Sequence, residues 1–235
     1  MSISKEQEVL LQFVKRWFNR PDQISHYLTE VSDGPTKAER YLLNNLFENG
    51  TILDVGCGAG RISMFLAEKG YKVIGVDVSE SLIIKAREIS KKKDLDINFI
   101  VTKGIELPFD GETYDFIVGF KFLCYIPTSQ LRHDYLKNLY RILRPGGILL
   151  ITQNIVPEEY IDEARDEYFQ GCSASHFTSL EQGDNFPLGD GYVHWFTEKQ
   201  LLDELSNTEF LIEQFDTDEA HAGDGLLRLV KLRKD

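Results

Sequence analysis

The amino-acid sequence predicts an α/β protein built on a doubly wound parallel sheet. From Thr51 to about residue 153, short β-rich runs alternate with helical stretches, the pattern of a parallel sheet with helices on both faces. The runs Thr-Ile-Leu-Asp-Val and Val-Ile-Gly-Val-Asp are almost entirely apolar, as expected for strands buried on both sides. A length of 235 residues with 42% hydrophobic side chains suffices for one domain with a large core.

Two helical stretches are predicted ahead of the sheet. Residues 4–20 place apolar side chains at the spacing of one helical face, and Asn19-Arg20-Pro21-Asp22 ends this helix. A turn at 32–35 precedes a second helical stretch that contains Tyr41 to Phe47 and ends at Asn49-Gly50.

The alternating part follows, with five strands and three helices. They are strand 51–55, helix 59–69, strand 72–77, helix 79–92, strand 97–102, strand 114–119, helix 128–143 and strand 147–153.

The C-terminal part is predicted to begin with an acidic helix at about 158–170 and a loop-like stretch from Gly171 to Tyr192. Helix 197–206 and strands 208–215 and 226–233 follow, and the short spacing of the two strands favours a terminal hairpin. We therefore expect a single domain, 1–235, in four parts: an N-terminal helical cap (1–48), a core (49–153), an insertion (154–194) and a C-terminal helix and hairpin (195–235).

Composition narrows the class of protein. The formal net charge is −12, and residues 151–225 hold 18 Asp and Glu against two basic side chains. A chain this acidic offers no evident face to neutralise phosphates, which disfavours a nucleic-acid partner. The N-terminus does not resemble a secretory signal, no apolar run is long enough to span a membrane, and the three cysteines lack Cys-x-x-Cys spacing. We expect a cytoplasmic protein without a metal site, either monomeric or homodimeric.

A glycine-rich turn carries the first chemical signal. In Leu53-Asp54-Val55-Gly56-Cys57-Gly58-Ala59-Gly60-Arg61, a buried strand runs through the turn directly into a helix. Glycine allows positive φ and close approach of a ligand, and the helix N-terminus adds unpaired N–H donors. Arg61 stands where the dinucleotide fingerprint has its third glycine, so the motif is Gly-x-Gly-x-Gly preceded by an acid.

An acid ends the next strand. Asp77 follows Gly56 by 21 residues, and a carboxylate at that strand tip can accept hydrogen bonds from both hydroxyls of a ribose. The competing interpretation is a helix N-cap, but Ser79 already fills that position.

Together these motifs resemble the class I S-adenosylmethionine-dependent methyltransferases. Besides the glycine turn and Val-Asp-Val-Ser, the chain carries Leu107-Pro108-Phe109 before Tyr114-Asp115-Phe116-Ile117-Val118, and Arg144-Pro145-Gly146-Gly147 before an apolar strand, in the family's order and spacing. The resemblance is close over residues 38–153 and looser to the C-terminus. It implies a Rossmann-like, seven-stranded, mostly parallel sheet with one antiparallel strand in the C-terminal hairpin.

The resemblance also implies where the cofactor, S-adenosylmethionine, would lie. Asp54 and the loop of Gly56, Cys57, Gly58 and Gly60 would hold its methionyl part. Asp77 would bind the ribose, and Val78, Gly104 and Ile105 would surround the adenine. Gly119 and Phe120 would flank the methionine and the sulfonium.

The sequence departs from the family at one position. Many members place an acid four residues before Leu107, where it accepts from the adenine amino group, and this chain has Lys103. A lysine cannot accept a hydrogen bond. The contact must therefore be lost, made through water, or replaced by Glu106 or a backbone carbonyl.

Methyl transfer from a sulfonium mainly requires alignment of the acceptor, and a general base helps only when the acceptor arrives protonated. Near the expected mouth of the sheet lie Lys121, Tyr125, His176, His194 and Trp195, of which Tyr125 and His194 are the candidate catalytic residues. His26, His133 and His221 are interpreted as surface or packing residues, whereas Tyr27 could close over the cofactor.

The predicted function is methyl transfer to N or O of a small molecule, with S-adenosylhomocysteine as the second product. The insertion is expected to cover the substrate, and its acidity either attracts a cationic substrate or only aids solubility. Lys121 would instead suit an anionic substrate. The alternatives are a non-catalytic S-adenosylmethionine sensor, transfer of a group other than methyl from a related sulfonium, and methylation of a protein side chain or terminus.

Overall fold

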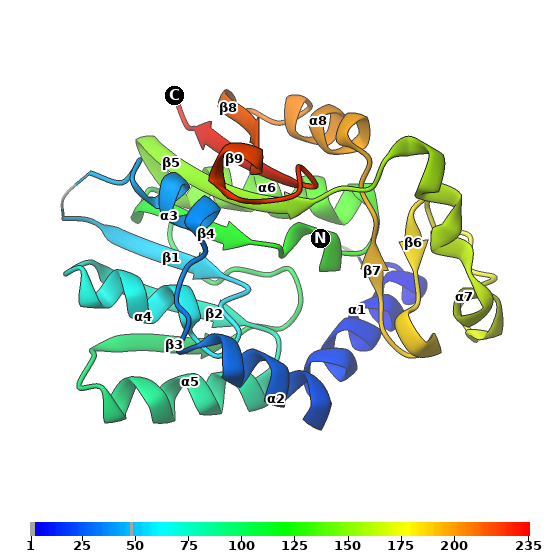
Figure 1. Cartoon of the computed structure of the whole chain (residues 1–235), viewed down its shortest axis with the longest axis horizontal. Helices are drawn as coiled ribbons and strands as arrows, with labels where there is room; N and C mark the ends of the chain where they lie inside the picture. Colours follow the sequence, from blue (N-terminus) through cyan, green and yellow to red (C-terminus); the bar gives the residue numbers. More distant parts are fainter. Residues whose placement is uncertain (1–2, 48) are drawn as a thin grey trace.

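A computed structural model describes residues 3–47 and 49–235 of the chain. Met1, Ser2 and Glu48, which belong to the predicted cap, lie outside the described residues. Seven strands form one sheet in the order β3-β2-β1-β4-β5-β9-β8 (Figure 1). β9 is the one strand of this sheet that runs in the opposite direction to the others, so the predicted mixed sheet is confirmed. The strands are β1 (Thr51–Val55), β2 (Lys72–Asp77), β3 (Ile97–Val101), β4 (Tyr114–Phe120), β5 (Leu143–Asn154), β8 (Leu211–Thr217) and β9 (Leu227–Arg233).

Helices cover both faces of this sheet. On one face, α3 (Lys37–Leu43), α4 (Arg61–Glu68) and α5 (Glu80–Lys92) bury strand residues such as Phe116 and Phe99. On the other face, α6 (Ser129–Ile142) and α8 (Glu198–Ser206) pack on strand residues such as Ile117 and Leu149. The alternating apolar strand residues thus supply two cores, which fixes the positions of the strand ends.

The cap contains a helix that the sequence did not predict. α1 (Lys5–Phe18) begins at a capping box of Ser4 and Gln7 and is followed at once by α2 (Pro21–Glu30). The interpretation of Asn19-Arg20-Pro21-Asp22 as a simple stop was therefore incomplete. Proline lacks an N–H, and the first position of a helix does not need one, so Pro21 ends one helix and starts the next. The second predicted stretch is the shorter α3, which ends at Leu43 and leaves Phe47 outside it.

The insertion is more irregular than predicted. Instead of one helix over 158–170, the chain forms the 3-10 helix η2 (Glu158–Arg165) and then the short α7 (Glu167–Gly171). Asp166 separates them because its extended backbone caps α7, with a carboxylate oxygen accepting from the Phe169 N–H at 2.8 Å. The two-residue strands β6 (Asp184–Asn185) and β7 (Val193–His194) pair, with η3 (Pro187–Gly189) between them.

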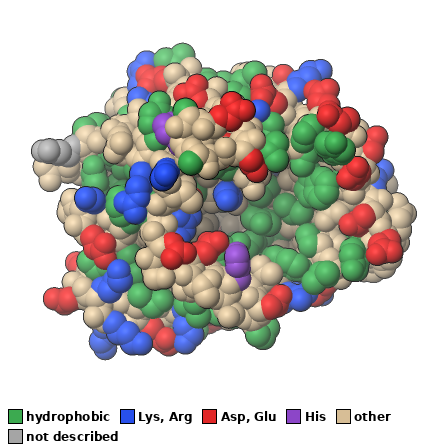
Figure 2. Space-filling view, in the orientation of Figure 1, with side chains coloured by type: hydrophobic (Ala, Val, Ile, Leu, Met, Phe, Trp, Pro, Cys, Tyr) green, Lys and Arg blue, Asp and Glu red, His purple; other side chains and the backbone are tan. Residues whose placement is uncertain are grey.

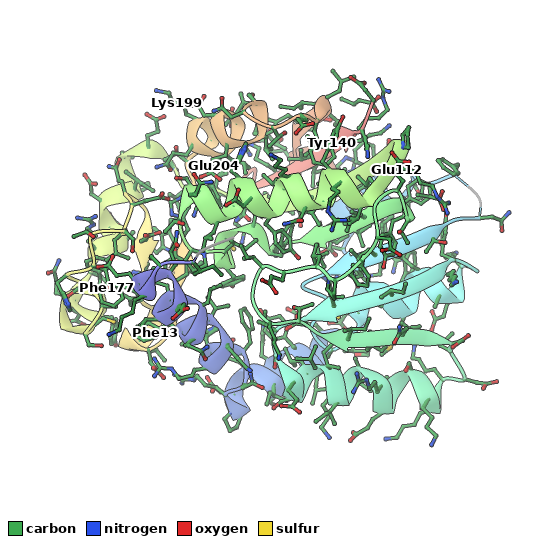
Figure 3. The ribbon with its side chains drawn as sticks, turned by 180° about the vertical axis from the view of Figure 1, so that it is seen from behind. Phe13, Glu112, Tyr140, Phe177, Lys199 and Glu204 are labelled. Carbon is green, nitrogen blue, oxygen red and sulfur yellow. The ribbon has the colours of Figure 1, made fainter. Side chains whose placement is uncertain are left out.

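The insertion packs against α1. Leu10, Phe13 and Val14 share an apolar cluster with Phe169 and Phe186 of the insertion, and the rings of Phe13 and Phe186 meet edge to face at 5.7 Å. Figure 3 shows Phe13 where α1 meets the insertion, with Phe177 nearby. Polar contacts add to this junction: the Ser179 N–H donates to the Glu6 carboxylate at 2.9 Å, and Arg16 pairs with Asp190 at 3.0 Å. The insertion therefore holds α1 in place.

Two further elements complete the described chain: the 3-10 helix η1 (Leu123–Tyr125) after β4, and η4 (Glu219–His221) between β8 and β9. Over residues 3–47 and 49–235, no helix combines the length and the apolar character that crossing a bilayer requires.

Candidate functional site

A cavity of about 950 Å³ lies at the carboxyl ends of β1, β2 and β4, beneath the cap. Its floor is formed by the turns that follow these strands, and its roof by α1, α2 and the turn before α3. Figure 2 shows the molecule hollowed near its middle, with acidic and basic side chains around the hollow and a hydrophobic area beside it. Parallel α/β sheets bind ligands at this edge, and the volume is at the upper end of the range for small-molecule sites.

The glycine turn forms one part of the floor. Gly56, Gly58 and Gly60 have φ of +66°, +54° and +88°, and the last is the N-cap of α4. A Cβ on Gly58 would lie 4.0 Å from the nearest side-chain atom, so a side chain there would project into open space in the cavity. The turn therefore leaves room for a ligand to lie directly on the backbone.

Asp77 lies next to this turn at the tip of β2. Its two carboxylate oxygens accept from the Gly58 N–H at 2.9 Å and the Ser79 N–H at 2.7 Å. A carboxylate has about four acceptor positions, so capacity remains on the side that lines the cavity. Burial raises the pKa of Asp77 despite these two hydrogen bonds, because desolvation disfavours the charged form.

Asp54 lies behind the turn and not on the cavity wall. Its side chain is 3% exposed and accepts from the Ser63 hydroxyl at 2.5 Å. Burial raises the pKa of Asp54 to about 7, against the lowering effect of the Ser63 hydrogen bond. This hydrogen bond ties the Asp54 carboxyl group to the first turn of α4.

Seven of the eleven predicted cofactor residues line the cavity: Gly56, Gly58, Asp77, Val78, Gly104, Ile105 and Phe120. Asp54, Cys57, Gly60 and Gly119 are not among the lining residues. At Gly119 a Cβ would come within 2.4 Å of the Phe122 ring, so close packing accounts for this glycine.

At the other end of the floor, Lys103 lines the cavity beside Gly104. A Cβ on Gly104 would lie 3.4 Å from Leu11 of α1, so the cap approaches the backbone closely here. Glu106, the suggested substitute for the missing acid, lines a neighbouring hollow of about 340 Å³ and is not among the residues lining the main cavity.

Three aromatic side chains, Phe18, Tyr27 and Tyr125, join the cap to the floor, and we call them the aromatic cluster. The ring of Phe18 meets that of Tyr125 edge to face at 4.7 Å and lies 5.7 Å from that of Tyr27. Burial raises the pKa of each phenol well above its usual range, so both keep their protons near neutral pH.

The segment 121–128 that carries Tyr125 is held in a strained conformation. Lys121 has φ +55° and Thr128 has φ +63°, and a β-branched residue rarely adopts such a value. Gln153 of β5 accepts from the Cys124 N–H at 3.2 Å, and Gln7 of α1 donates to the Thr128 hydroxyl at 3.0 Å. Contacts from β5 and the cap therefore fix the position of Tyr125.

The predicted catalytic residues separate in the structure. Tyr125 and Lys121 line the cavity, whereas His176, His194 and Trp195 are not among its lining residues. His194 is 2% exposed, with Nδ1 2.7 Å from a carboxylate oxygen of Asp184, which also accepts from the Tyr192 hydroxyl. This environment is that of a buried structural histidine.

The structure also differs from the expectation that the insertion covers the substrate. None of the described residues of 154–194 lines the cavity; residues of the cap line it instead. Two features of the sequence account for this difference. The prediction treated Pro21 only as the end of a helix and therefore missed α2, and it interpreted His26 as a surface residue. The cavity-lining residues of α2 are His26, Tyr27 and Glu30. Their i, i+1, i+4 spacing is the signal that could have identified the cavity-facing side of this helix.

One group outside the cavity has spacing suitable for a metal ion. Potential ligand atoms of Glu181, His194 and Glu204 lie within 4.8 Å of one another. The guanidinium of the buried Arg132, however, contacts Glu181 at 2.7 Å and Glu204 at 2.6 Å. Figure 3 shows Glu204 of α8 beside α6, the helix that carries Arg132. Arg132 already supplies the positive charge, so we assign no metal to this group.

Comparisons with known proteins show which proteins this chain is similar to. Residues 52–147 match the family model described as "Methyltransferase domain". The chain is 37% identical over 167 residues to the ubiquinone biosynthesis O-methyltransferase of Coxiella burnetii, a match covering 65% of this chain and 70% of that protein. It is 32% identical over 162 residues to the methyltransferase GfsG of Streptomyces halstedii, covering 67% of this chain and only about half, 54%, of GfsG.

A solved structure agrees with these matches. An S-adenosylmethionine-dependent methyltransferase from Methanosarcina mazei superposes with a TM-score of 0.66 at 28% identity, covering 83% of this chain and 96% of that one.

Proposed function

Since the chain belongs to the S-adenosylmethionine-dependent methyltransferases, we propose that it methylates a nitrogen or an oxygen of a small molecule held in the cavity beneath the cap. The observation that carries this proposal is the arrangement of the cavity, with the glycine turn and Asp77 on its floor and the aromatic cluster joining the floor to the roof. The 37% identity to a protein named as an O-methyltransferase supports a small acceptor.

We assign cofactor binding to the floor. The open space at Gly58 and the spare acceptor positions of Asp77 suit the backbone contact and the ribose hydroxyls of S-adenosylmethionine. Val78, Gly104 and Ile105 supply an apolar surface for adenine, and Gly56 and Phe120 lie toward β4 for the methionine part. When bound, the cofactor supplies a methyl group already activated by its sulfonium. Asp54, Cys57, Gly60 and Gly119 act indirectly, by shaping the turns.

We assign acceptor binding to the roof and to segment 121–128. The aromatic cluster offers flat apolar surfaces for a ring, and its two phenols, which keep their protons, can donate hydrogen bonds to an acceptor. Lys121 offers a positive charge at the same wall. These groups orient the acceptor and exclude water, and such positioning can supply roughly 7–11 kcal/mol of the barrier lowering.

Calorimetry with S-adenosylmethionine and S-adenosylhomocysteine tests the cofactor assignment. We expect both to bind the wild-type protein and Asp77→Ala to weaken both, whereas Asp96→Ala, an exposed acid that does not line the cavity, has no effect. Mass spectrometry of a metabolite extract incubated with protein and cofactor then tests for products heavier by one methyl group. Binding without any methylated small molecule would oppose the proposed function, as would equal affinities of wild type and Asp77→Ala.

A further inference from the structure

One corner of the cavity is built around an arginine that joins the cap to the glycine turn. Arg61 follows Gly60 as the first residue of α4, and its Nη1 and Nη2 donate to the two carboxylate oxygens of Glu39 at 2.6 and 2.7 Å. Nη1 also donates to the Gly34 carbonyl at 2.9 Å. Figure 1 shows the connection from α2 to α3 crossing in front of α4. Arg61, Glu39 and Gly34 all line the cavity, so this corner lies beside the glycine turn.

Several hydrogen bonds hold this corner in place. The side chain of Glu39 is 1% exposed and that of Arg61 is 19% exposed. The Thr36 N–H donates at 2.7 Å to the Glu39 oxygen that also accepts from Nη1, and the Thr36 hydroxyl accepts from the Glu39 N–H at 3.2 Å. A guanidinium fixed by a bidentate pair keeps one orientation before any ligand arrives.

The guanidinium keeps one edge for a ligand. Arginine has five N–H donors, and three of those of Arg61 donate to Glu39 and Gly34. The Nε–H and the second N–H of Nη2 donate to no described residue. A carboxylate oxygen of Glu30 lies 4.0 Å from Nε, which is too long for a hydrogen bond. These two adjacent donors can therefore bind a carboxylate on the planar edge of the group.

The methionyl end of S-adenosylmethionine carries a carboxylate and an ammonium group, and both need partners in the site. Asp54, which the sequence suggested for this end, is hidden behind the turn. Four lysines also line the cavity, on α1 and after β3 and β4: Lys5, Lys15, Lys103 and Lys121. None of these four ammonium groups has a hydrogen bond or an ion pair to a described residue. Arg61 is therefore the lining cation that is already oriented, and orientation before binding lowers the entropy cost of binding.

We propose that Arg61, oriented by Glu39, binds the carboxylate of the methionyl end of S-adenosylmethionine through its free edge. This inference rests on the proposed function and adds a charged contact to the cofactor site. The negative charge of Glu30 would disfavour a lone carboxylate here, but the methionyl end also carries an ammonium group one carbon away, which Glu30 attracts. The alternating charges of Glu39, Arg61 and Glu30 thus match a zwitterion.

Decarboxylated S-adenosylmethionine isolates the carboxylate, since it keeps the adenosine, the sulfonium and the ammonium group. In calorimetry, wild-type protein should bind the intact cofactor roughly 10- to 100-fold more tightly than the decarboxylated one. Arg61→Gln should abolish this preference by weakening the intact cofactor, while the affinity for the decarboxylated one stays equal or rises. Arg144→Gln, which breaks an arginine–carboxylate pair that does not line the cavity, is the matched control and should keep the preference.

A second variant guards against loss of folding. Arg61→Gln leaves the buried Glu39 carboxylate without its cation, which destabilises the corner. The double variant Arg61→Gln, Glu39→Gln removes both charges, and we expect it to fold and to lack the preference as well.

The same titrations can overturn the assignment. Equal weakening of both ligands in the two variants would show that Arg61 only supports the fold of the turn. Wild-type protein that binds both ligands equally would also oppose the carboxylate contact, as would a preference that is lost in Lys121→Met and kept in Arg61→Gln. Wild-type protein that binds neither ligand would instead overturn the proposed function.

Discussion

The Gly58 N–H donates a hydrogen bond of 2.9 Å to a carboxylate oxygen of Asp77, so the turn after β1 is tied to the tip of β2. The same carboxylate lines the cavity. One side chain therefore sets the shape of the glycine turn and presents acceptor positions to a ligand. A change at Asp77 should affect both.

Asp77→Asn should weaken binding of the cofactor by roughly 10- to 100-fold, since charge-assisted hydrogen bonds contribute about 1.5–3 kcal/mol each. Titration calorimetry measures the effect, and Asp96→Asn serves as the control at an exposed acid. Affinities of Asp77→Asn and wild type within twofold of each other would exclude the ribose contact.

Asp54 should make the protein less stable as pH rises. Burial raises its folded-state pKa from an ordinary 3.8 to about 7, so the folded protein binds this proton more tightly than the unfolded chain does. This stabilising contribution is complete at or below about pH 4 and is lost as pH rises through 7, for a total of at most about 4 kcal/mol. Urea unfolding of wild type and Asp54→Asn at pH 5 and 8 measures it. The variant should lose less stability over this interval, and equal losses would contradict the raised pKa.

His194→Gln should reduce stability and leave catalysis nearly unchanged. The substitution removes a ring buried between Asp184 and Phe196, away from the cavity lining. We expect a loss of about 1–3 kcal/mol, the usual result of leaving a buried hydrogen-bonding group without its partner. Unfolding curves and kcat/KM for any acceptor found in the metabolite screen distinguish the roles. A stable variant with kcat lowered a hundredfold would restore His194 as a catalytic residue.

Arg132→Leu should destabilise the protein by about 3–5 kcal/mol, because Glu181 and Glu204 would lose the cation that neutralises them. Burial disfavours the charged form of Glu181, but the attraction of Arg132 contributes more in the opposite direction, so the pKa of this carboxyl group stays below its usual value. The triple variant Arg132→Leu, Glu181→Gln, Glu204→Gln should regain much of the loss in denaturant unfolding. If the triple variant is no more stable than the single one, charge compensation is not the role of Arg132.

Phe13→Ala should loosen the roof of the cavity. Phe13 is 7% exposed and packs on Phe186, and truncation of such a ring costs about 3–5 kcal/mol. Hydrogen exchange should speed up together in α1 and in residues 169–192. Tyr168→Ala, at a ring 46% exposed, is the control and should leave both segments protected. Faster exchange confined to one segment would show that the two do not support each other.

Periodicity located the sheet well because buried parallel strands carry an unmistakable apolar pattern. The strand 72–77 was predicted at the bounds it has, and Asp77 was placed correctly at its tip. Local patterns were less informative where one residue serves two elements. Pro21 was interpreted only as an end, and Asp166 divides a segment whose composition alone favours one helix.

Which residues line the cavity depends on tertiary packing, and no local sequence pattern encodes that packing. His194 follows an acidic stretch and precedes an aromatic pair, features that fit an active site as well as a buried network. His26 lies on a helix with few apolar neighbours, and only the docking of α2 over the sheet brings it to the cavity. The residues that line the floor of the cavity could be predicted from sequence motifs, whereas those that line the roof could be identified only from the folded structure.

The attachment of α1 to the insertion bears on how the protein forms during synthesis. α1 leaves the ribosome well before the insertion does, because the Ser179 and Phe186 contacts that hold it come more than 160 residues later in the sequence. Contacts so distant in sequence form slowly, because a long loop must close first. The nascent chain can assemble the floor from residues 51–120 while its roof still lacks a support. The complete cavity, and any selectivity for the acceptor, would therefore arise only late in folding.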